Sequence, residues 1–194
     1  MKTRAKQKTA ADRIQGGDSI RVLVSGFKNQ SRVSIDDIAA TIDALPDFHL
    51  VGLDEIIYDP EWETPSALTL QEINCPRKSK GVYMPDKRQV LVFDFDDAAE
   101  LQHILYHEIG HHVFDRVLES TLRKQWVTLI NPDSRHVTRY ATLNAQEDFA
   151  ECYAMFVRDP KALQPIYKKY EFLRDHVFAG IAYNATQGHI DISV

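Results

Sequence analysis

The chain has little cysteine, with only Cys75 and Cys152 among its 194 residues. Two cysteines cannot build the disulfide framework of a small secreted domain, so both are expected to be free thiols. The N-terminus is basic but has no apolar segment behind it, and no hydrophobic run approaches the length of a membrane span. We therefore expect a protein that is cytoplasmic as synthesised and has no membrane partner, with signal-independent export as the alternative.

The chain also lacks a surplus of positive charge, because 23 Lys and Arg residues face 28 Asp and Glu residues. Residues 1–13 hold five basic residues and one acid, so residues 14–194 keep 18 basic and 27 acidic residues and sum to −9. A dedicated nucleic-acid binder normally carries a basic surplus, and this class is therefore disfavoured. The basic residues of the arm are Lys2, Arg4, Lys6, Lys8 and Arg13.

An apolar fraction of 44% predicts a folded chain, and the periodicity of its apolar residues predicts the elements. We expect a flexible basic arm over 1–18, one domain over 19–180 and a C-terminal tail over 181–194. The expected strands cover 20–26, 50–58, 81–85 and 89–95, with 59–80 as a loop. The expected helices cover 35–45, 97–119, 122–130, 145–158 and 161–178. This order predicts an α+β fold, in which a small mixed sheet with an antiparallel edge strand precedes a helical half.

One motif inside the helix expected over 97–119 carries chemistry. His107-Glu108-Ile-Gly-His111 places two imidazoles four residues apart, which puts them on one helix face. Two neutral imidazoles with an open position suit Zn²⁺, and the adjacent carboxylate suits a general base acting on water. We expect one zinc ion per chain, held by His107 and His111, with Glu108 as the base.

Other residues near this motif offer alternatives. Glu108 and His112 also form an i,i+4 pair, and His103 lies four residues before His107, although three positions along one helix span too much length to reach one ion. His136 is a possible third ligand from a loop. Asp115, four residues after His111, is a candidate either to orient a ligand histidine by a hydrogen bond or to lie on the surface without a part in the site.

A catalytic zinc ion needs a third protein ligand, and the helix expected over 145–158 offers two. Glu147 and Glu151 lie four residues apart on one face of that helix. One of the two acids is expected to bind the metal. The other is then expected to orient a ligand histidine by accepting a hydrogen bond from its second ring nitrogen.

The two helical motifs together resemble those of the gluzincin metallopeptidases, and in particular the protease domain of anthrax lethal factor and the bacterial Pro-Pro endopeptidases. The residues that carry the resemblance are His107-Glu108-x-x-His111, Tyr140, Asn144 and Glu147-Asp-Phe-Ala-Glu151. The resemblance implies His107, His111 and Glu147 as ligands, Glu108 as base, Tyr140 as donor to the oxyanion and Glu151 in the second shell. It also implies a zincin-like fold with the active-site cleft between sheet and helical half.

The function expected on these grounds is zinc-dependent hydrolysis of a peptide or protein substrate. An extended substrate is expected to add to the edge strand Gly81, Val82, Tyr83 and Met84. A regulatory metalloprotease of the ImmA/IrrE type, acting on a bound repressor, and a binding protein on a zincin scaffold are the alternatives. A preference for basic substrates is a further hypothesis, drawn from the acids Asp59, Glu61, Glu63, Asp94, Asp96 and Asp97, which are expected near the cleft entrance.

Overall fold

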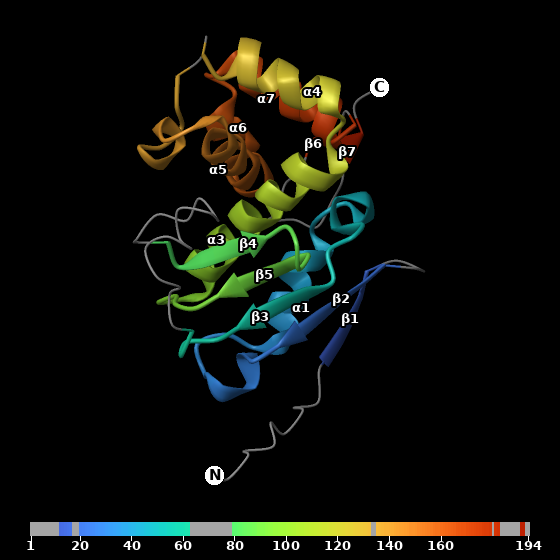
Figure 1. The fold of residues 1–194 in the computed structure, drawn as a ribbon, viewed down its shortest axis with the longest axis vertical. Coiled ribbons are helices and arrows are strands. Elements are labelled where there is room, and N and C mark those ends of the chain that lie inside the picture. The colour runs from blue at the N-terminus through green and yellow to red at the C-terminus, as the bar shows by residue number, and fades with distance from the viewer. Residues whose placement is uncertain are drawn as a thin grey trace.

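The computed structural model describes residues 12–16, 20–62, 79–132, 135–179, 181–182 and 191–192. Most of the basic arm, most of the loop expected over 59–80, Cys75 and much of the expected tail lie outside these residues. Within them the chain forms an open mixed sheet followed by a helical half, which confirms the expected α+β class (Figure 1). None of the helices in these ranges is long and apolar enough to cross a membrane.

The sheet has five strands in the order β1-β2-β3-β5-β4. The central strands β2, β3 and β5 run parallel, while β1 pairs with β2 and β4 pairs with β5 in the antiparallel sense. The prediction of an antiparallel edge strand next to the helical motif is therefore confirmed. The strands are β1 (Asp12–Gly16), β2 (Ile20–Ser25), β3 (Glu55–Tyr58), β4 (Gly81–Met84) and β5 (Gln89–Val92).

Two segments at the ends of the chain differ from the prediction. Residues 12–16, expected in a flexible arm, form β1 at the far edge of the sheet, paired along their whole length with β2. The pairing satisfies backbone groups along one side of residues 12–16, so this part of the expected arm belongs to the sheet. In the expected C-terminal tail, β6 (Ile181–Ala182) pairs with β7 (Asp191–Ile192).

The helix α1 (Ile35–Asp43) connects β2 to β3 and begins as expected at Ser34, whose side chain accepts a hydrogen bond from the Asp37 amide in a capping box. The strand expected over 50–58 is shorter, because a 3-10 turn, η2 (Asp47–Leu50), ends at Leu50 and β3 begins only at Glu55. Gly52 follows with a φ of 81°, a left-handed conformation that turns the chain before β3.

The helical half contains α3 (Ala98–His112), α4 (Ser120–Gln125), α5 (Ala145–Arg158), α6 (Pro160–Leu163) and α7 (Tyr167–Phe172). Three of the expected helices continue as π-helical segments, η3 (Val113–Val117), η4 (Trp126–Ile130) and η6 (Leu173–Val177). The single helix expected over 161–178 is broken between α6 and α7. Pro165 has no N–H for a continuous helix, and Ile166 leaves the helical region with a φ of −104° and a ψ of 64°.

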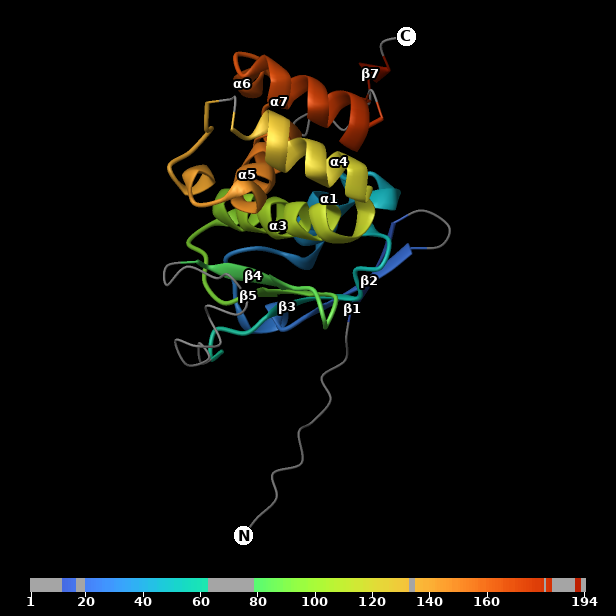
Figure 2. The same ribbon diagram turned by 45° about the horizontal axis from the view of Figure 1, so that its top comes forward.

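Helix α3 is the central layer of the molecule. It lies across one face of the sheet against β4 and β5, and α4, α5 and α7 stack on its opposite side (Figures 1 and 2). Nine of its 15 residues are buried, including His107 and Glu108. The motif of the sequence analysis therefore lies between two layers, with its carboxylate toward the sheet and its histidines toward α5.

A buried histidine ties the first half of the chain to the last helices. His49 in η2 is fully buried, its Nε2–H donates to Val177 O (2.8 Å), and its Nδ1 accepts from the Tyr153 hydroxyl (2.7 Å). Burial favours the neutral ring and lowers the pKa of His49 to about 4, with a smaller contribution from nearby His112. Protonation of this ring therefore opposes folding.

We predict that this histidine makes the fold acid-sensitive. Its contribution to the free energy of unfolding is complete above the unfolded-state pKa of 6.5 and falls as the pH drops toward about 4. At about 1.4 kcal/mol for each pH unit between these values, the full loss is about 3 kcal/mol. Urea unfolding of the protein and of His49→Gln at pH 7.5 and pH 4.5 measures it. Equal pH dependence in the two proteins would contradict the prediction.

Candidate metal centre

The close crossing of α3 and α5 brings the two motifs together. Gly110 stands at the contact, where a Cβ would lie 3.0 Å from the Ala150 Cα and 3.3 Å from the Tyr153 Cβ. A larger residue at position 110 would push the helices apart. The absence of a side chain at this point lets the face of α5 that carries Glu147 and Glu151 approach the histidines of α3.

Three donor atoms converge on one point between these helices. His107 Nε2 and His111 Nε2 are 3.1 Å apart, and Glu147 Oε2 lies 3.1 Å from the first and 3.3 Å from the second. His107 and Glu147 are buried, whereas His111 is partly open to solvent. The residues expected as ligands are therefore the ones that the fold brings together.

The spacing of these atoms fits a zinc ion. Donors bound to one tetrahedral ion at about 2.0–2.1 Å lie roughly 3.3 Å from one another, and the three distances are 3.1–3.3 Å. Within the described residues, the buried Glu147 Oε2 has no hydrogen-bond donor that satisfies it. A cation at the centre would meet this unsatisfied acceptor, so the donor set fits the metal that the motif predicts.

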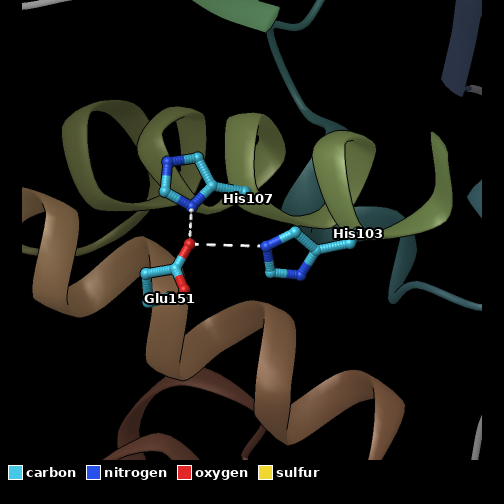
Figure 3. Close-up of side chains that lie close together, drawn as sticks. All are labelled: His103, His107 and Glu151. Carbon is cyan, nitrogen blue, oxygen red and sulfur yellow. Dashed lines mark ion pairs between the residues drawn. The ribbon is translucent and has the colours of Figure 1, made fainter. Parts of the chain in front are cut away.

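A second group of side chains lies on the opposite side of His107 (Figure 3). Glu151 Oε1 is 2.7 Å from His107 Nδ1 and 3.5 Å from His103 Nε2, so its carboxylate lies between the two rings. The 2.7 Å contact is too short for two ligands of one zinc ion but suits a charged N–H and carboxylate pair. Glu151 therefore forms an ion pair with His107 at Nδ1 and with the more exposed His103, and the orienting role expected for it stays a prediction.

Carboxylates control the charge of this site. Burial alone would lower the pKa of His107, but Glu147 and Glu151 outweigh it and raise that pKa to about 10. Burial likewise opposes the charged form of Glu147, yet His107 and His111 lower its pKa to about 2. The pKa of Glu151 is also lowered, against burial, by His103 and His107. The field that favours a proton on His107 favours a metal cation at the same place, and binding must then displace that proton.

The Glu108 carboxylate lies between the donor group and the edge strand. Its Oε2 accepts a hydrogen bond from the Tyr83 N–H (2.7 Å). The glycine at position 81 leaves room for α3 to lie this close to β4, because a Cβ there would lie 2.7 Å from Ile104 Cγ2 and 3.3 Å from Glu108 Cγ. Burial raises the pKa of Glu108, an effect that His107 and His111 partly offset. The role of Tyr83 as a partner of the base was not foreseen, although Tyr83 was expected at this site.

Tyr140 reaches the same place from a different segment. It begins the 3-10 turn η5 (Tyr140–Thr142), shortly before Asn144 caps α5, and its ring contacts the His107 ring edge-on at a centroid distance of 5.6 Å. The sequence offset from Glu147 therefore corresponds to proximity in space. The expected oxyanion donor lies beside a candidate ligand.

The free edge of β4 is partly occupied by its own chain. Phe93 N–H donates to Lys80 O. Because hydrogen-bonded and non-hydrogen-bonded residue pairs alternate along two antiparallel strands, the backbone N–H and C=O groups of Gly81 and Tyr83 point away from β5. The Tyr83 N–H already binds Glu108, and the Ser79 hydroxyl contacts both backbone groups of Gly81. The backbone N–H and C=O groups of Val82 point toward β5. A substrate strand would have to displace Ser79.

Three sequence candidates are not part of the donor group. Asp115 is 48% exposed and pairs with Arg116, because α3 gives way to η3 at Val113 and the helical face does not continue. His112 is turned toward the sheet, where it contacts the Tyr83 hydroxyl and Val51 O. Neither His112 nor Asp115 belongs to a convergent donor group of the described residues, and Asp115 has the surface position that was its other expected role.

His136, the loop candidate for the third ligand, contacts Asp148 instead, at 3.0 Å from its Oδ1. That contact lies on a different face of α5 from Glu147. The assignment of the third position to α5 rather than to the loop agrees with this geometry.

Of the six acids expected near the cleft entrance, Asp94 and Asp96 pair with Lys80, whereas Glu63 lies outside the described residues. Lys80 Nζ lies 2.8 Å from Glu100, 3.1 Å from Asp96 and 3.5 Å from Asp94, all near the start of α3. Asp97 caps that helix. The charges of Asp94, Asp96 and Asp97 therefore serve Lys80 and the helix terminus, and the preference for basic substrates stays a prediction.

An open pocket of about 540 Å³ adjoins the second group. His103 and Glu151 form part of its wall, together with Thr138, Met155 and Arg158. This pocket lies within the helical half, whereas the expected cleft runs between the sheet and the helices.

No protein-family model matches the sequence, and no curated protein does. The resemblance to the gluzincins therefore rests on the residues of the two helical motifs and on Tyr140. The geometry described above is independent of that resemblance.

Proposed function

We propose that the protein is a zinc-dependent endopeptidase whose sheet and helices have a zincin-like arrangement. The observation that carries the proposal is the convergence of His107 Nε2, His111 Nε2 and Glu147 Oε2 beside the buried carboxylate of Glu108. A metal site that served structure alone would have no need of a buried base between the ligands and an edge strand. When bound, zinc would lower the pKa of a water ligand toward about 7 and polarise a carbonyl oxygen.

In this proposal Glu108 accepts the proton of the attacking water and returns it to the leaving amine. One of its oxygens is fixed by the Tyr83 N–H, which leaves the other oxygen for the water. Burial raises its pKa, and a carboxyl group whose pKa lies nearer the working pH exchanges protons more effectively. Glu151 holds His107 through Nδ1, and Tyr140 donates to the oxygen on which negative charge develops.

A broad peptide library tests the proposal. Purified protein with one zinc ion per chain is expected to cleave members of the library, a chelator to stop the cleavage, and added zinc to restore it. A Glu108→Gln preparation, purified in the same way, controls for contaminating proteases. Stoichiometric zinc without cleavage of any peptide would overturn the proposal and favour the binding scaffold.

The hydroxyl of Tyr140 gives a second prediction. Tyr140→Phe keeps the ring against His107 but removes the donor, so we expect kcat to fall while KM and the zinc content stay nearly unchanged. Loss of one such donor costs about 10²–10³-fold in kcat in other hydrolases. Steady-state kinetics on a library-derived peptide measures the effect, and an unchanged kcat would remove Tyr140 from the mechanism.

A further inference from the structure

A fully buried ion pair begins one residue after Glu147. Asp148 on α5 and Lys169 on α7 are both 0% exposed, and Lys169 Nζ lies 2.5 Å from Asp148 Oδ1. Taking two charges out of water is costly, and a buried pair is not by itself a stabilising feature. Neither residue takes part in the reaction proposed above. The contacts that the pair makes with its surroundings indicate another use.

Both members of the pair hold the same short segment. Lys169 Nζ donates to Arg135 O (2.8 Å), and Asp148 Oδ1 lies 3.0 Å from His136 Nδ1. The Arg135 guanidinium in turn donates to Pro165 O (2.7 Å), just before α7. Residues 135 and 136 are thereby fixed to α5 and to α7 at once.

This segment leads to Tyr140. Between Arg135 and the cap of α5 at Asn144, the only helical structure is the single 3-10 turn η5. One such turn supplies few backbone hydrogen bonds of its own; it packs on α5 with Ala141 buried, and side chains hold its two ends. Asn144 fixes the far end, because its side chain accepts from the amides of Gln146 and Glu147. The buried pair fixes the near end.

We propose that Asp148 and Lys169 are positioning residues for Tyr140. The pair locks the start of the 135–143 segment onto α5, the helix that also carries Glu147, and so sets the Tyr140 ring against His107. The consequence for catalysis rests on the proposed function, whereas the consequence for the segment does not. Glu147 itself lies within α5, so its contact with the histidines does not require the pair.

The double substitution Asp148→Asn with Lys169→Met tests this inference. Both charges are removed together because a single change would leave one buried charge without its partner. We expect zinc content and KM to stay near those of the parent and kcat to fall by roughly tenfold or more, since a displacement of about 1 Å can cost about a hundredfold. In a Tyr140→Phe background the same double substitution is expected to cause little further loss.

Hydrogen exchange supplies a readout that needs no activity. Amides of residues 135–142 are expected to exchange faster in the double variant, while those of α3 keep their protection. Tyr153→Phe, which removes a buried hydrogen bond from another part of α5, and Arg174→Met, which breaks exposed ion pairs after α7, are matched controls expected to leave 135–142 unchanged. Unchanged exchange there, or an equal loss of kcat with and without Tyr140, would overturn the inference. Absence of peptidase activity in the parent protein would overturn the proposed function. Hydrogen exchange alone would then test whether the buried pair positions the 135–143 segment.

Discussion

Glu108→Gln is expected to reduce peptide hydrolysis by about 10²–10⁴-fold, which is the usual contribution of a positioned general base. The amide keeps the size of the side chain, and its oxygen can still accept the hydrogen bond from the Tyr83 N–H. It cannot take a proton from water. Zinc content is expected to stay at one per chain, because Glu108 contributes no atom to the group of His107, His111 and Glu147. Metal analysis and kinetics on one preparation measure both quantities.

Asp115→Asn is the matched control for this variant. It removes a carboxylate just beyond the C-terminal end of the same helix, where the side chain is exposed and paired with Arg116. We expect activity and zinc content to equal those of the parent protein. A Glu108→Gln protein that retained more than about a tenth of the parent activity would show that another group accepts the proton.

The part of the site that the sequence predicts well is the part that depends on helix geometry alone. The pairing of His107 with His111 and the bounds of α5 (Ala145–Arg158) are local properties, and the structure has both. For Asp115 the sequence left two roles open, because the i,i+4 rule holds only while the helix stays α-helical, and η3 begins at Val113. The apolar pattern does not reveal this change of helix type, so the sequence alone could not choose between the two roles.

The roles of the partners depend on packing, which periodicity cannot supply. In the sequence, the two acids on one face of α5 are equally good candidates for the third ligand. The crossing of α3 and α5 at Gly110 and Ala150 places one of them near Nε2 of His107 and the other near Nδ1. The sequence holds one weak signal for Lys169, because this lysine stands four residues before Leu173, on the apolar side of the last expected helix. Its partner Asp148 is distant in sequence, so only the fold joins them.

Glu147→Gln and Glu151→Gln are expected to differ sharply in their effect on zinc binding. The two acids are one turn apart on α5 and equally buried, at 4% and 5% exposure, so changes in helix propensity and burial are matched. Glu147 supplies an oxygen to the convergent group, and its loss leaves two histidines, one of them partly open to solvent. We expect Glu147→Gln to lose zinc during dialysis against a weak chelator.

Glu151→Gln should bind zinc about 10–100-fold more weakly than the parent, the usual cost of removing a partner that orients a ligand histidine. The reason is that Glu151 touches His107 only at Nδ1, the nitrogen that faces away from the convergent group. Competition with a chromophoric chelator gives both affinities. The reverse ranking, with Glu151→Gln losing zinc and Glu147→Gln keeping it, would place the metal on the His103 side of the ring. Because the 2.7 Å contact there is a hydrogen-bond length and the three distances on the other side are those of a tetrahedral ion, we expect the first ranking.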